Sequence, residues 1–117
     1  MDHKNLDAWK ESIKLVKEIY KISSKFPKEE LYGLTNQIRR AAVSISSNIA
    51  EGAARQSDRE MIQFLYVALG SLAEVETQMI IAVELGYIDG QILLNDLILK
   101  NKQLLLGLIR YLKGKKK

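Results

Sequence analysis

The chain has 117 residues, one proline, no cysteine and a formal net charge of +4. This length predicts one domain, residues 1–117, with a core of its own, and the lack of cysteine excludes disulfides and thiolate chemistry. The lysine-rich tail, residues 113–117, carries four positive charges, so residues 1–112 are neutral overall. A solvated helix end and an anion-binding arm both account for such a tail.

Apolar residues recur at intervals of three or four through most of the chain, which predicts helices. The first helix is expected from about Asp7 to Lys25. Pro27 cannot continue it and is expected to start a connector over residues 27–34. A second helix is predicted to begin with Thr35 as its N-cap. Its many small side chains predict the closest helix packing in the molecule.

Ser57 and Glu60 have the spacing of a capping box, so a third helix is predicted from there to about Leu85, where Gly86 stops it. Its core stripe is predicted to include Ile62, Leu65, Leu69, Leu72, Ala73, Ile80 and Val83. A fourth helix is predicted to bury Leu94, Leu97, Ile98, Leu105, Leu108, Ile109 and Leu112, with Asn101 as a satisfied polar contact. Short connections favour antiparallel neighbours, so the predicted fold is all-α, an up-down-up-down four-helix bundle.

The N-terminus is polar and has no apolar stretch of the signal-peptide type. The most apolar region, residues 92–112, is interrupted by charged and amide side chains and does not resemble a membrane span. A cytoplasmic location without membrane association is therefore expected.

A second apolar stripe lies away from the predicted core. Ile92, Leu99 and Leu106 are seven residues apart and align on the far side of the fourth helix, and Val67 and Ile81 are displaced in the same way on the third. An aligned exposed stripe indicates a contact surface, which predicts a homo-oligomer. The alternative is a helix that is buried on several sides within one bundle.

Residue types required for common catalytic sites are missing. The one histidine is His3, so neither a zinc site nor a serine–histidine pair is expected. A glycine-rich phosphate loop and a Glu-x-x-His pair are also absent from the sequence. The sequence therefore predicts no metal, no cofactor and no enzymatic activity.

Glu76 falls on the core side of the third helix in this reading. A buried carboxylate needs a partner, and Arg39 or Arg40 on the second helix could supply a structural ion pair. The alternative is a catalytic or metal-binding carboxylate.

Lys10, Lys14, Lys17 and Lys21 fall in one strip of the first helix. Such a strip could follow a phosphate backbone, together with Lys113, Lys115, Lys116 and Lys117 of the tail. Lysines beside a buried face also cover it with their aliphatic stems. Residues 57–88 carry a charge of −4, against +3 for residues 1–28 and +5 for residues 89–117. Basic and acidic sides of the bundle are therefore expected, and an oligomer would repeat them.

Six segments resemble one family: residues 26–30, 32–35, 37–45, 48–52, 74–78 and 85–88. They are similar to bacterial four-helix-bundle proteins encoded in intervening sequences of 23S ribosomal RNA genes, over about Leu6 to Leu112. The sequence departs from the commoner pattern at Ser46, where proline is frequent, and at Ala53 and Ala54.

The resemblance implies a ring-shaped homo-oligomer, a pentamer. A related branch, the accessory protein of diversity-generating retroelements, binds nucleic acid and a reverse transcriptase through a basic barrel. The sequence therefore favours a non-enzymatic homo-oligomer that binds RNA or other nucleic acid non-specifically. The alternative is a protein-interaction scaffold that binds no nucleic acid.

Overall fold

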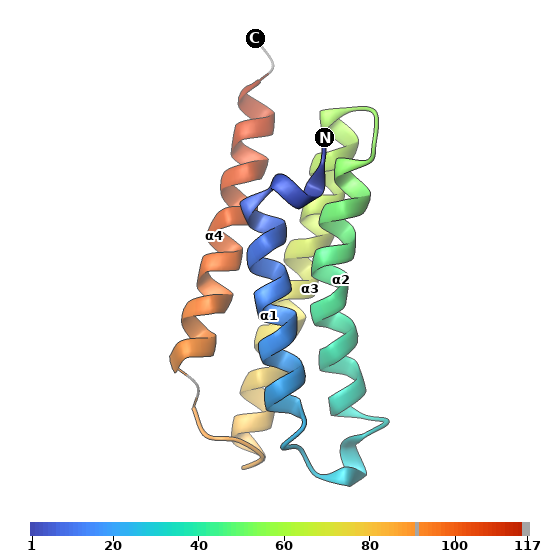
Figure 1. Ribbon diagram of the computed structural model, residues 1–117. Coiled ribbons are helices and arrows are strands. Elements are labelled where there is room, and N and C mark those ends of the chain that lie inside the picture. The colour runs from blue at the N-terminus through green and yellow to red at the C-terminus, as the bar shows by residue number, and fades with distance from the viewer. Residues whose placement is uncertain (91, 116–117) are drawn as a thin grey trace.

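The computed structural model describes residues 1–90 and 92–115, and the side chains of residues 92 and 93 are not described. Its helices are α1 (Asp7–Ser23), α2 (Leu34–Ala53), α3 (Asp58–Glu84) and α4 (Ile92–Gly114), with 3-10 turns η1 (His3–Asn5) and η2 (Lys28–Glu30). Consecutive helices run in opposite directions (Figure 1), and the predicted all-α bundle is confirmed. In the described residues α1 packs against α2 and α4, and α3 also packs against α2 and α4.

The connector between α1 and α2 is held by a side chain that the sequence did not single out. α2 begins at Leu34, and Gly33 at its N-cap position offers no side-chain hydrogen bond. Glu30 replaces the cap: its Oε1 accepts from the Leu34 backbone N–H at 2.9 Å, and its Oε2 accepts from the Tyr87 hydroxyl at 2.8 Å. The prediction of Thr35 as N-cap is therefore wrong, and Thr35 is buried inside the first turn.

The Glu30 carboxylate also joins the two connectors at this end of the bundle, since Tyr87 follows α3. The two hydrogen bonds, from Leu34 first and from Tyr87 second, lower the pKa of Glu30. The hydrogen bond to Glu30 raises the pKa of Tyr87, because ionising the hydroxyl would remove the proton that it donates and would also place two negative charges together.

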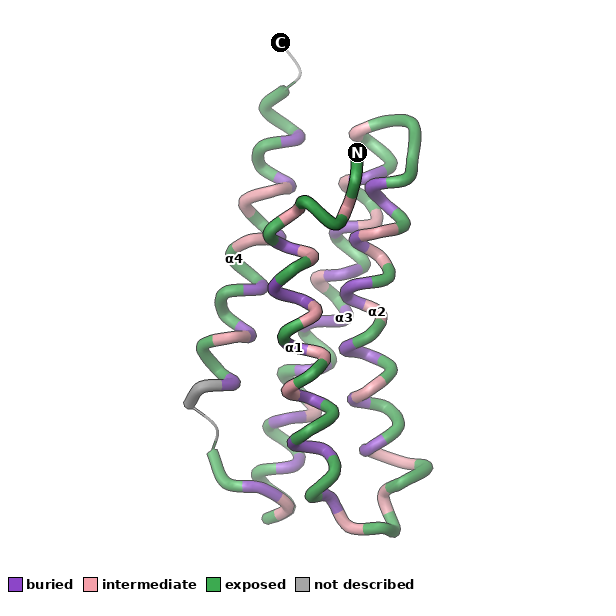
Figure 2. Tube along the Cα trace, viewed as in Figure 1, coloured by how far each residue is buried: buried purple, intermediate pink, exposed green. Residues whose placement is uncertain are grey.

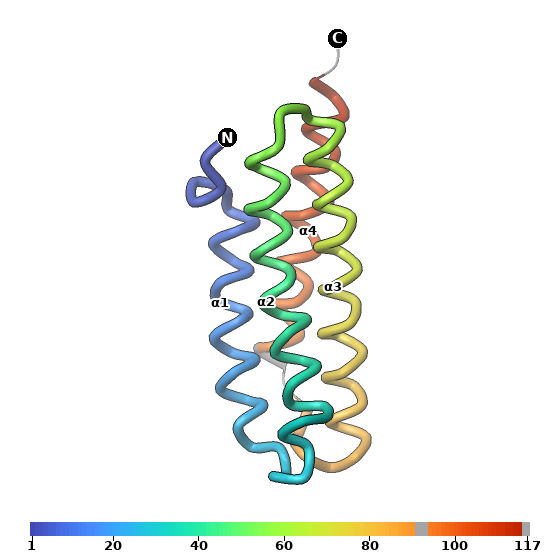
Figure 3. The backbone as a smooth tube through the Cα atoms, turned by 90° about the vertical axis from the view of Figure 1, so that its right-hand side faces the viewer, coloured from blue at the N-terminus to red at the C-terminus, as the bar shows by residue number. Residues whose placement is uncertain are grey.

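α2 and α3 approach each other closely along their length (Figure 3). Gly52 near the end of α2 makes this possible: a Cβ atom there would lie 2.9 Å from the Phe64 Cβ and 3.2 Å from the Met61 carbonyl oxygen. Both atoms belong to rigid parts of α3. Gly52 therefore permits α2 and α3 to lie in contact here, and it is buried.

α3 begins and ends as predicted. The Ser57 hydroxyl accepts from the Glu60 N–H at 3.2 Å, which confirms Ser57 as the N-cap, and the Glu60 carboxylate accepts from the Ser57 hydroxyl at 3.3 Å. Gly86 follows the last turn with φ of 77°, a left-handed conformation that favours glycine.

The core occupies the axis of the bundle (Figure 2) and receives side chains from all four helices. In α4, Leu94, Ile98, Leu105, Ile109 and Leu112 are buried as predicted, while Leu97 and Leu108 are partly buried against the core.

The predicted core stripe of α3 is wrong in part. The buried side chains are Met61, Leu65, Ala68, Ser71, Leu72, Val75, Met79 and Ala82. Ala73, Ile80 and Val83 are exposed, and Ile62 and Leu69 are only partly buried. The actual stripe is displaced around the helix and contains more small residues.

α3 is long and apolar enough to cross a membrane by length and composition, with 33% of its apolar stretch buried in the bundle. The core helix of a soluble protein passes the same test, and α3 packs against both α2 and α4. The apolar residues on its outer side are therefore a feature of its surface that needs an explanation.

Candidate functional site

The structure exposes all four lysines of the predicted strip on α1, which are Lys10, Lys14, Lys17 and Lys21. Two of them have acidic partners on their own helix. Lys14 Nζ donates to Glu11 Oε2 at 3.0 Å, and Lys21 Nζ lies 3.8 Å from Glu18 Oε2. The strip is therefore partly neutralised before any ligand arrives.

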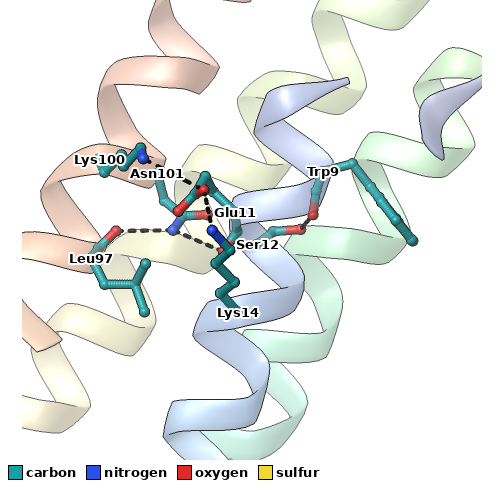
Figure 4. A network of polar contacts seen from close by, with 7 residues as sticks. All are labelled: Trp9, Glu11, Ser12, Lys14, Leu97, Lys100 and Asn101. Atoms are coloured by element: carbon teal, nitrogen blue, oxygen red, sulfur yellow. Dashed lines mark hydrogen bonds and ion pairs between the residues drawn. The ribbon is translucent and has the colours of Figure 1, made fainter. Parts of the chain in front are cut away.

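A groove of about 430 Å³ runs between α1 and α4 beside this strip and is lined by Glu11, Lys14, Lys17, Glu18, Asp96, Leu97 and Lys100. Glu11 is 8% exposed and lies between two ammonium groups, with Lys100 Nζ at 3.5 Å (Figure 4). The hydrogen bond from Lys14 and the charge of Lys100 lower the pKa of Glu11, against the opposing effect of burial. Equal numbers of acidic and basic side chains line this groove, so it is not a strongly cationic surface.

Asn101 lies behind the groove and is 1% exposed. Its Nδ2 donates to the Leu97 carbonyl at 2.9 Å and to the Glu11 carbonyl at 3.3 Å, so it connects α4 to α1 (Figure 4). The prediction that Asn101 faces the core is confirmed. It is only half satisfied, because its Oδ1 has no hydrogen-bond partner among the described residues.

Two hydrogen-bonded serine pairs join α1 to α2 and α2 to α3. The Ser12 hydroxyl donates to the Trp9 carbonyl at 2.6 Å, so Ser46 is the donor in the 2.7 Å contact between the two serine hydroxyls. Ser44 and Ser71 join α2 to α3 at 2.9 Å. We call this set the polar chain: Asn101, Ser12, Ser46, Ser44 and Ser71, which together connect all four helices.

The residues predicted to contact another subunit are exposed where the structure describes them. Val67, Ile81, Leu99 and Leu106 are 52%, 41%, 52% and 37% exposed. The side chain of Ile92 lies outside the described residues. The sequence reading missed Ile80, Val83 and Leu85, which are also exposed, because it assigned the first two to the core.

These apolar side chains occupy two flanks of the bundle. Ile81 lines a shallow groove of about 310 Å³ together with Leu34 and Gln37 of α2. Leu99 and Leu106 lie on α4, on the other side of α3. Since Val67 and Ile81 are 14 residues apart on α3, they align on one face of that helix.

The predicted burial of Glu76 is wrong, because this side chain is exposed. It lies at the seam between α3 and α4, where it lines a small cavity with Lys102. No salt bridge joins Glu76 to Arg39 or Arg40 within the described residues. Arg39 instead donates through Nε to the Ser23 hydroxyl at 2.8 Å and covers the Tyr20 ring at 4.7 Å.

The C-terminal lysines belong to a second groove, at the end of the bundle where α3 begins and α4 ends. This end groove has a volume of about 670 Å³ and is lined by Asp58, Arg59, Ile62, Gln63, Leu112, Lys113 and Lys115. Lys115 Nζ lies 3.2 Å from Asp58 Oδ2, and Lys113 Nζ donates to the Tyr66 hydroxyl at 3.0 Å. Lys116 and Lys117 lie outside the described residues.

Within residues 1–90 and 92–115, no group of three or more histidine, aspartate or glutamate side chains is arranged to hold a metal ion.

Comparison with protein families matches residues 4–107 to the family described as 23S rRNA-intervening sequence protein. No curated protein matches the chain. The match extends from η1 through most of α4, so it includes the polar chain. It ends before Lys113 and Lys115, and the basic end of α4 therefore lies outside the matched range.

Proposed function

Because the chain belongs to the 23S rRNA-intervening sequence protein family, we propose that it is a non-enzymatic, cytoplasmic homo-oligomer whose repeated lysines bind RNA phosphates. One observation carries this proposal: apolar side chains of α3 and α4 remain outside the core of the single bundle. Covering them with other copies of the chain would remove them from water.

The two flanks favour a ring. A contact that joins one flank of a subunit to a different flank of the next is head-to-tail, and such contacts close into rings when the rotation permits. Val67 and Ile81 on one flank, and Leu99 and Leu106 on the other, supply two such surfaces. The family resemblance implies five subunits.

Assembly also makes RNA binding more favourable than the charge of one subunit suggests. Every subunit adds its own exposed lysines, and a polyanion that contacts several subunits gains from each of them. Lys10 and Lys17 have no salt bridge within the described part of the chain, so they are the α1 lysines most available to phosphates. Lysine contacts of this kind carry no sequence information, so binding is proposed to be non-specific.

The test is light-scattering mass, measured for the protein alone and with a short structured RNA at physiological salt. The expected result is a defined oligomer that gains the mass of the RNA. The variant Leu99→Asp with Leu106→Asp should reduce the mass to that of a monomer, while Tyr32→Asp, at a loop side chain that is 92% exposed, should not. A monomeric wild-type protein at micromolar concentration would refute the assembly.

A protein-interaction scaffold is the second candidate function. The observation in its favour is that Glu11 and Glu18 already hold Lys14 and Lys21. An oligomer that gains no RNA mass at physiological salt, and that retains a host partner after nuclease treatment, would support the scaffold instead.

A further inference from the structure

Aromatic rings and cations meet at one end of the bundle. The Arg55 guanidinium lies 4.8 Å from the Phe64 ring centroid, Lys113 Nζ lies 5.4 Å from the Tyr66 centroid, and Lys115 Nζ lies 5.9 Å from the Tyr111 centroid. Tyr66 and Tyr111 are 48% and 61% exposed. Aromatic rings interleaved with cations are the surface by which proteins hold unpaired nucleic acid.

Tyr66 extends the end groove described above. It lies four residues after Ile62 and three after Gln63, so it follows them on the same face of α3. The groove thus has an apolar floor in Ile62 and Leu112, and a cationic rim in Arg59, Lys113 and Lys115. Its volume of about 670 Å³ lies in the range of sites that enclose small organic ligands.

We propose that this end groove binds unpaired nucleotides of RNA, with a base stacked on Tyr66 and the neighbouring phosphates held by Arg59, Lys113 and Lys115. The inference rests on the RNA binding proposed above and gives it a ligand class. Lys113 leaves the ring at little cost, because cation–π contacts at exposed sites are weak. Lys115 exchanges a surface ion pair with Asp58 for a phosphate, and such pairs are also weak.

The chemistry of the groove favours unpaired RNA over duplex RNA and over an acidic peptide. The bases of a duplex are stacked on one another and cannot present a face to Tyr66. An acidic peptide would use the cations but would leave the exposed ring and the apolar floor unused. A nucleotide would use the cations through its phosphate, and the exposed ring and the apolar floor through its flat base.

The experiment is fluorescence anisotropy of the whole oligomer with labelled oligouridine, which is unpaired, and with a duplex RNA of the same length. Tyr66→Leu should weaken oligouridine binding on the order of ten-fold and leave the salt dependence unchanged. Tyr66→Phe keeps the ring and should bind as the wild type does. Lys113→Gln should lower the slope of log affinity against log salt by about one. Tyr32→Leu is the matched control, since Tyr32 is an exposed tyrosine in the connector between α1 and α2, and this connector lies at the other end of the bundle (Figure 1).

Each contrary outcome is distinct. If the wild type binds RNA and Tyr66→Leu binds oligouridine equally well, the end groove is refuted and the proposed function stands. If the wild type binds neither RNA, the RNA part of the proposed function is refuted too. If polyglutamate at an equal concentration of charge displaces oligouridine, the groove is a site for acidic peptides. A lower light-scattering mass for Tyr66→Leu would assign the groove to a subunit contact. Both of these last results overturn the inference.

Discussion

Replacing Gly52 by alanine tests the close approach of α2 and α3. In most helix interiors this change is stabilising, because alanine has the higher helix propensity, by about 1 kcal/mol. At position 52 the new Cβ would meet the Phe64 Cβ at 2.9 Å and the Met61 carbonyl oxygen at 3.2 Å. Neither atom is the mobile end of a side chain, so the helices themselves must separate.

The expected magnitude follows from these two opposing effects. Inserting a methyl group into a well-packed interface costs about 1–3 kcal/mol. After the gain in helix propensity of about 1 kcal/mol, Gly52→Ala should lower the free energy of unfolding by about 1 kcal/mol.

Urea unfolding followed by circular dichroism measures this change as a shift in midpoint at constant slope. Gly107→Ala is the matched control, since a Cβ there meets no atom within 4 Å and the position is also inside a helix. It should raise the free energy of unfolding by up to about 1 kcal/mol. All variants need the same protein concentration, because the proposed assembly would contribute to stability by mass action.

The signs decide the outcome. Gly52→Ala and Gly107→Ala should change stability in opposite directions. If Gly52→Ala is as stabilising as the control, α2 and α3 are not held at the distance seen here, and the explanation of Gly52 by helix contact is refuted.

Three further predictions concern hydrogen bonds. Asn101→Asp should destabilise the protein by about 3 kcal/mol, because it replaces a buried donor to two carbonyl oxygens by a carboxylate; an unchanged urea midpoint would contradict this. Ser12→Ala and Ser46→Ala should show a coupling energy of about 1 kcal/mol in a double-mutant cycle, and additive effects would show that their contact contributes nothing. The pKa of Glu30 in the folded protein is lowered from its usual 4.5, so its contribution to stability is complete above that value and is lost as the pH falls through the lowered pKa. Glu30→Gln should remove this part of the acid dependence, measured by urea unfolding across acidic pH, and an identical profile would contradict the cap.

Helix positions and the fold class follow from the sequence because caps and stop signals are local. Ser57 with Glu60, Pro27 and Gly86 act within a few residues of themselves, and each is found where it was expected. The cap on α2 was missed because Glu30 acts from a neighbouring turn, and its second partner, Tyr87, is distant in sequence.

The core face of α3 was assigned wrongly for a different reason. This helix is apolar over much of its length and carries bulky apolar residues outside as well as inside the bundle, so its periodicity selects one face only weakly. Bulky residues such as Ile80 and Val83 were assigned to the core, and Ala68 and Ala82 were not included in it. The structure instead buries Ala68, Ser71 and Ala82 together with larger residues such as Leu65 and Leu72. Glu76 was then placed inside together with its bulky neighbours.

The candidate sites were only partly accessible from sequence. The lysines of α1 were identified by their spacing, but their pairing with Glu11 and Glu18 depends on side-chain geometry. The end groove joins the first turn of α3 to the last turn of α4. Residues so far apart in the chain are brought together only by the topology.

The polar chain also limits how the four helices can slide past one another. Hydrophobic burial by itself has little directionality, so it distinguishes only weakly between alignments of the helices that differ by one turn, about 5.4 Å. A shift of that size would break the hydrogen bonds between Ser12 and Ser46, between Ser44 and Ser71, and from Asn101 to the Glu11 carbonyl. A few polar contacts inside the bundle can thus favour one alignment of the helices over alignments shifted by one turn. In a bundle with an apolar helix such as α3, these directional contacts help to fix one alignment of the four helices.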